Sequence, residues 1–136
     1  MYFKAILIAI GFVSLVGWAS PAQADGRVQP VYNVVDAAIA TGSGNEPTLA
    51  QVEQAISAAA TYKRWTVHRI DDGHLAASIH VRKHFAKVDI TFTTEVFSIK
   101  YLDSKVLRYD GTNIHRNYNK WIILMERRIH HNLNAL

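Results

Sequence analysis

The 136-residue chain contains no cysteine, only three prolines and seven glycines. The absence of cysteine excludes disulfide frameworks, thiolate zinc sites, thiol nucleophiles and a cysteine-linked lipid anchor. The small number of glycines and prolines excludes collagen-like and low-complexity sequence. Because 49% of the residues are hydrophobic and only 19% are charged, a disordered tail is also excluded. The length suits one domain with a single core.

A long apolar run occurs at the N-terminus, where residues 5–19 form an almost unbroken hydrophobic stretch after Lys4. Residues 22–24 (Ala-Gln-Ala) then supply the small side chains that signal peptidases accept. The stretch is shorter than the roughly 20 apolar residues that a membrane-spanning helix needs. We therefore expect residues 1–24 to be a signal peptide cleaved after Ala24, in preference to an uncleaved anchor, and the protein to be periplasmic.

The chain is moderately basic, with a formal charge of +4 and a pI near 9.5. Cleavage after residue 24 lowers the charge only to +3, because Lys4 is the one charged residue removed. A basic protein in the periplasm meets anionic lipid head groups and cell-wall polymers. We expect no nucleic-acid partner. Peripheral contact with an anionic envelope surface stays open as an alternative, because the excess of positive charge is small.

Residues 25–47 lack a regular hydrophobic period and are expected to form a flexible arm ahead of a single α+β domain at residues 48–136. A short strand could occupy residues 31–35. Residues 42–45, which are Gly, Ser, Gly and Asn, favour turns.

The domain is expected to begin with a helix whose N-cap is Thr48. Gln51 lies three residues further on, as in a capping box, and Pro47 disfavours an earlier start. The helix should end near residues 62–64, where two cations complement the negative end of the helix dipole. Its apolar stripe consists of Leu49, Val52, Ile56 and Ala59 or Ala60.

Apolar and polar residues alternate along the middle of the chain, which predicts strands. The expected strands are residues 65–70, 74–81, 84–92 and 96–102. Two-residue turns between the last three strands place Ile79 opposite Ala86 and also Ile90 opposite Ile99. Both registers gather the apolar side chains on one face, so an antiparallel meander is predicted. The register of the first strand stays open, since a bulge at the Asp-Asp-Gly turn would exchange its faces.

A final helix is predicted from Ile114 to near Leu133, with N-cap candidates at residues 110–113 and with Trp121 on its apolar stripe. The opposite face of the sheet is polar and lightly basic, as expected of a face turned to water. The predicted fold is therefore a two-layer α+β sandwich. Along the chain it consists of a helix, a four-stranded antiparallel meander and a second helix, and both helices lie on one face of the sheet.

Catalytic chemistry has little support in the sequence. Seven histidines are present, but HExxH and similar carboxylate-paired metal motifs are absent. His80 and His84 flank a predicted turn and should point to opposite faces. There is no G-x-S-x-G element, and no glycine-rich phosphate loop follows residue 24. We expect no metal, no cofactor and no catalytic residue; a minor histidine-dependent hydrolase is kept as a second alternative.

Residues 101–121 are rich in side chains that stack and form hydrogen bonds, as in sites for carbohydrates or peptides. Turn formation, helix capping and core packing account for about half of these side chains, and they do not explain residues 115, 117 and 119. The predicted ligand-binding residues are Tyr109, Asp110, His115, Asn117 and Asn119.

A longer run that contains this segment, SIKYLDSKVLRYDGTNIHRNYNKWIILMERRI, resembles the C-terminal part of a family of small exported bacterial proteins of unassigned function, many of them lipoproteins. The resemblance extends from about Tyr32 and includes VYNV, TLAQVEQAI and the strand at Trp65. It implies export but no substrate and no catalytic residue. Many relatives carry a lipobox cysteine that residues 22–24 replace here, so we expect a soluble protein.

The expected function is that of a soluble periplasmic accessory or binding protein, whose partner is a small polar ligand or an envelope component. The alternative is a basic structural or stress protein that associates with the membrane or the cell wall.

Overall fold

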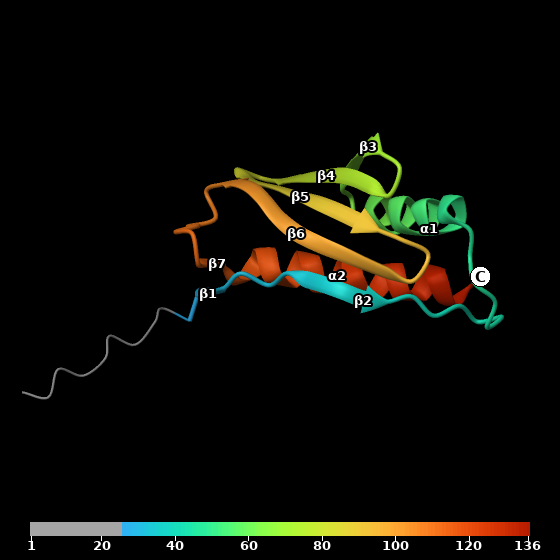
Figure 1. Ribbon diagram of the computed structural model, residues 1–136. Coiled ribbons are helices and arrows are strands. Elements are labelled where there is room, and N and C mark those ends of the chain that lie inside the picture. Colours follow the sequence, from blue (N-terminus) through green and yellow to red (C-terminus); the bar gives the residue numbers. More distant parts are fainter. Residues whose placement is uncertain (1–25) are drawn as a thin grey trace, which may run out of the picture.

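The computed structural model describes residues 26–136, so the predicted signal peptide lies outside the described residues. Figure 1 shows two helices packed against a sheet. The elements are β1 (Val28–Pro30), β2 (Val34–Ala38), α1 (Leu49–Tyr62), β3 (Thr66–Asp71), β4 (His74–Val81), β5 (His84–Phe92), β6 (Val96–Lys105), β7 (Asn113–His115) and α2 (Arg116–Asn134). Neither helix has the length and apolar character that a membrane span requires.

The predicted α+β class and the antiparallel meander are confirmed. Ile79 pairs with Ala86, and Ile90 pairs with Ile99, as the turn geometry required. The sequence left the register of the first strand of the meander open. In the structure this strand, β3, pairs antiparallel with β4, and the register shifts between Arg69 and Asp71. The bulge considered at the Asp-Asp-Gly turn therefore lies at the end of β3.

The prediction of four strands was too low. The main sheet has five, in the order β2-β6-β5-β4-β3, and β1 pairs with β7 in a separate two-stranded sheet. Residues 28–30 and 34–38 thus form strands within the segment that the sequence assigned to an arm. Val34 is the one fully buried residue of β2 and faces Ile99 of β6. With a single buried position and a partner 65 residues away, β2 produces no alternating pattern that the sequence could reveal.

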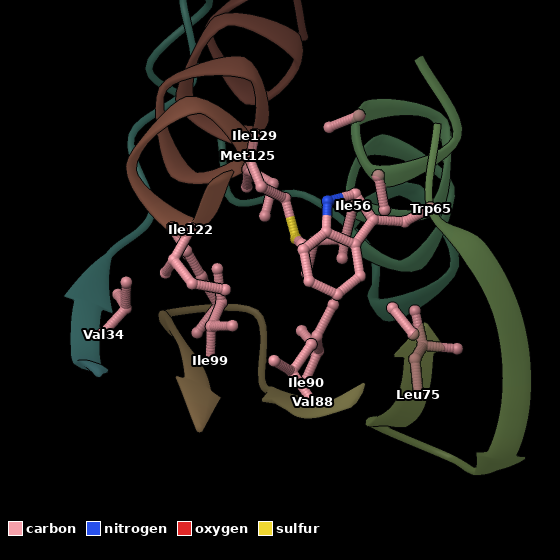
Figure 2. Close-up of a cluster of buried hydrophobic side chains, with 14 of the residues drawn as sticks. Val34, Ile56, Trp65, Leu75, Val88, Ile90, Ile99, Ile122, Met125 and Ile129 are labelled. Atoms are coloured by element: carbon pink, nitrogen blue, oxygen red, sulfur yellow. The ribbon is translucent and has the colours of Figure 1, made fainter. Parts of the chain in front are cut away.

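Both helices pack on the same face of the sheet, as predicted. Figure 2 shows side chains of α1 (Ile56) and α2 (Met125) converging on sheet residues such as Val88 and Ile90, with the indole of Trp65 between them. The capping box predicted for α1 is confirmed. The Thr48 hydroxyl accepts from the backbone N–H of Gln51 at 3.1 Å, and the Gln51 side chain accepts from the backbone N–H of Thr48 at 2.9 Å. 

Two predictions about the second helix need correction. α2 begins at Arg116, so Ile114 belongs to β7 and the N-cap is His115 in place of a residue at 110–113. Trp121 is only half-buried, although it packs against the core. Pairing of β7 with β1 keeps Ile114 extended, which delays the helix by two residues.

Candidate functional site

The five predicted ligand-binding residues do not line one cavity. Tyr109 borders a hollow of about 580 Å³ beside the end of β6, whereas Asn117 and Asn119 border another of about 510 Å³ along α2. Tyr109 stacks on Tyr101 with ring centroids 4.0 Å apart, and its own side chain is 42% exposed. The predicted residues therefore divide between two places, and their contacts decide which of them are available to a ligand.

Asp110 shapes the loop that leads into β7. Its carboxylate accepts hydrogen bonds from the backbone N–H groups of Asn113 at 2.7 Å and Thr112 at 2.9 Å. These bonds, that of Asn113 first, lower the pKa of the Asp110 carboxyl below its ordinary value. The side chain thus acts as an Asx turn that sets the direction of the chain before α2.

His115 joins three segments at the start of α2. Its Nδ1 accepts from the backbone N–H of Asn117 at 3.2 Å, so the imidazole caps the helix. Its backbone N–H donates to the carbonyl of Leu107 at 2.8 Å, and in β7 it pairs with Val28. The ring is half-buried, and capping engages its Nδ1 atom.

Asn119 is buried and holds the N-terminal segment against α2. Its Oδ1 accepts from the backbone N–H of Tyr32 at 2.9 Å, and its Nδ2 donates to the carbonyl of Pro30 at 2.9 Å and to the side chain of Gln29 at 3.3 Å. These hydrogen bonds give a structural role to Asn119, which core packing did not explain at the level of the sequence. They also explain why residues 29–32 lie ordered on the domain.

Replacing Asn119 with alanine is expected to lower the free energy of unfolding by about 2–3 kcal/mol, because it removes the two backbone hydrogen bonds, both part-buried, that hold Pro30 and Tyr32 on α2. Urea unfolding measures the loss. Asn117→Ala is the matched control, since Asn117 is exposed on the first turn of the same helix and should change stability by less than about 0.5 kcal/mol. Equal losses in the two variants would contradict the role assigned to Asn119.

A cluster of basic side chains surrounds His115 at the end of the molecule opposite the C-terminus. Figure 1 shows β1, β7, the β4–β5 turn, the end of β6 and the start of α2 at this end of the molecule. Arg116 donates its backbone N–H to the carbonyl of Arg27 at 2.7 Å, and the rings of His84 and His115 have centroids 6.4 Å apart. Lys105 pairs with Phe85 at the same end. The basic end, as we call this surface, consists of Arg27, Arg82, Lys83, His84, Lys105, Arg108, His115 and Arg116.

The positive charge of this surface affects the pKa of His115. Its pKa lies below the ordinary value, first because of partial burial and then because of Arg108, His84, Arg116 and Arg27 around it. The first turn of α2 carries no acidic residue, so the positive end of the helix dipole adds to the same potential. An anion placed here gains favourable interactions from several elements at once.

Sequence reasoning missed the basic end. Its members are three single residues, one pair (residues 115–116) and one run of three (residues 82–84), spread from Arg27 to Arg116, so no long run of like charge marks them. Only the pairing of β1 with β7 and of β5 with β6 brings them together. The sole signal was the overall positive charge of the chain.

Acidification is expected to destabilise the protein through His115. The folded-state pKa is lowered, so the unfolded chain binds the proton more readily, and stability falls as the pH drops through the ordinary value of 6.5 towards the folded pKa. Urea unfolding between about pH 7.5 and 5.5 measures this trend. His115→Asn keeps a good helix cap but does not titrate, and it should show a weaker pH dependence. An unchanged dependence would contradict the assignment.

Other histidines are dispersed. His80 faces Phe85 on the open face of the sheet, whereas His84 lies near His115, which agrees with the prediction that the two diverge. His74 Nε2 contacts the Asp89 carboxylate at 2.9 Å on the open face. Among residues 26–136, no group of three or more His, Asp or Glu side chains is arranged to hold a metal ion.

Comparisons with protein-family models, curated proteins and solved structures give no match.

Proposed function

We propose that the protein is an exported binding protein that recognises an anionic component of the cell envelope through its basic end. The observation that carries this proposal is that Arg27, His84, Arg108 and Arg116, which come from separate elements, surround His115. Arg82, Lys83 and Lys105 lie at the same end of the molecule. Cations gathered from separate elements around a helix N-terminus favour phosphate or carboxylate groups. The proposal is for binding in preference to catalysis.

Export is part of the proposal. It is supported by the leader-like residues 1–24 and by the resemblance of the C-terminal segment to small exported bacterial proteins. In the periplasm, phosphate and carboxylate groups of lipids and cell-wall polymers are the abundant anions. Of the five residues predicted from the sequence, Tyr109 and His115 belong to or adjoin the basic end and are retained as ligand contacts. Asp110 and Asn119 are assigned supporting roles, and the exposed side chain of Asn117 is assigned none.

The proposal is tested by titrating heparin, a soluble polyanion, into the protein that begins at residue 25. Logarithmic affinity is expected to fall linearly with the logarithm of salt concentration, because each phosphate-like or sulfate contact releases counterions. Isothermal titration calorimetry at several salt concentrations gives the slope. Absence of binding at low salt, or affinity that does not respond to salt, would refute recognition by charge.

A further inference from the structure

We propose that the basic end docks on an anionic lipid bilayer, with the exposed apolar side chains of Leu102, Val106 and Tyr109 entering the head-group region. The inference rests on the proposed function and names its partner. This end of the molecule displays large apolar side chains with cations beside them.

The apolar side chains form one surface. Leu102 is 46% exposed, Val106 55% and Tyr109 42%, and all three border the hollow of about 580 Å³ together with Arg108. Val81, which precedes the β4–β5 turn, is 36% exposed at the same end of the molecule. Such a grouping of large apolar side chains in water is costly unless a partner covers it.

Leu102 lies at a bulge in β6. Val88 of β5 pairs with Tyr101, whereas the preceding Lys87 pairs with Asp103, so Leu102 is the extra residue without a partner in β5. The core-facing residues of β6, Phe97 and Ile99, are at odd positions, so the regular alternation of the strand already directs residue 102 away from the core. Leu102 is therefore an apolar residue at a position that the strand exposes.

The loop after β6 holds Val106 at the surface through its backbone conformation. Val106 has φ of 61° and Arg108 has φ of 55°, a left-handed conformation that is rare for a β-branched residue. Between them Leu107 is only 1% exposed, so it anchors the loop in the core while its neighbours face outwards. The fold thus maintains a strained conformation in which an apolar side chain and a cation stand side by side at the surface.

Tyr109 is held on a rigid aromatic support. It stacks on Tyr101, whose ring meets the fully buried Tyr118 edge-on with centroids 5.7 Å apart. A preorganised aromatic side chain at the edge of an apolar surface is suited to the boundary between lipid head groups and acyl chains.

The cations select an anionic bilayer as the occupant. Arg108 borders the hollow and offsets the charge of Asp103, which also borders it. Lys105 and Arg116 belong to the basic end and add net positive charge at the same end of the molecule. A soluble polyanion would use these charges but leave the apolar side chains in water. A surface that combines anionic head groups with an apolar interior satisfies both sets of side chains, and each set alone gives weak binding.

Sedimentation with vesicles tests the inference. Full affinity is expected for vesicles that contain phosphatidylglycerol and almost none for pure phosphatidylcholine. The double variant Leu102→Gln and Val106→Asn should bind phosphatidylglycerol vesicles at least about tenfold more weakly, while its affinity for heparin stays unchanged. Asn suits position 106 because it tolerates positive φ. Ile70→Gln is the matched control, since Ile70 is 56% exposed on β3, outside the basic end, and should have no effect.

A second measurement does not depend on removing the apolar side chains. Tyr109→Trp should show a blue shift of fluorescence on adding phosphatidylglycerol vesicles, beyond any shift of the parent protein. Equal vesicle affinity of the double variant and the parent, or no shift at position 109, would overturn the inference. Binding to heparin without binding to vesicles would overturn it but leave the proposed function standing, whereas failure to bind either would overturn both.

Discussion

Replacing Trp65 with alanine is expected to lower the free energy of unfolding by about 3–5 kcal/mol, the usual cost of truncating a buried large aromatic side chain. Trp65 is 3% exposed and lies between the two helices and the sheet in Figure 2. Its backbone N–H donates to the carbonyl of Ala60 at 3.0 Å, which joins the end of α1 to β3. Loss of the indole therefore leaves a cavity where three elements meet. Urea unfolding followed by circular dichroism gives the change.

Trp121→Ala is the control for this prediction. Trp121 is only half-buried on α2, so its truncation removes less apolar contact and should cost about 1–2 kcal/mol. Comparable losses for the two variants would show that Trp65 does not hold the central position assigned to it.

Replacing Arg27, Arg108 and Arg116 together with glutamine is expected to weaken heparin binding by about 100-fold at low salt. Each cation near an anionic surface contributes about 1 kcal/mol, and about 1.4 kcal/mol corresponds to a tenfold change in affinity. The slope of logarithmic affinity against logarithmic salt concentration should decrease by about three, because three contacts no longer release counterions. Calorimetric titration measures both quantities.

A charge-matched control separates location from net charge. It replaces three cations outside the basic end with glutamine: Lys63, Lys100 and Arg127. If binding depends on the basic end, this variant should lose less than about threefold in affinity although its net charge falls equally. Equal weakening of the two triple variants would mean that overall charge, and not this surface, determines binding.

Short-range features of the fold could be predicted from the sequence. The pairing of Ile79 with Ala86 and of Ile90 with Ile99 follows from two-residue turns and the alternation of side chains, since a slip of one residue would expose half of the apolar set. The capping box at Thr48 likewise needs only residues three positions apart.

Features that depend on distant partners could not be predicted. β2 is an edge strand with one buried residue, and β1 and β7 have three residues each, too few for a period to show. Asn119 illustrates the consequence for the site: its polarity suggested a ligand, whereas its hydrogen bonds go to Pro30 and Tyr32, nearly ninety positions earlier. The basic end could not be foreseen because the same long-range pairings assemble it.

Nuclear magnetic resonance of the isotopically labelled chain, titrated with a heparin oligosaccharide, tests the central claim most directly. The account predicts that amide shifts change with dose at the start of β1, the β4–β5 turn, the end of β6 and the start of α2, and that the far end of α2 is unaffected. Shift changes centred on α1 or on the open face of the sheet, or no changes at low salt, would contradict it.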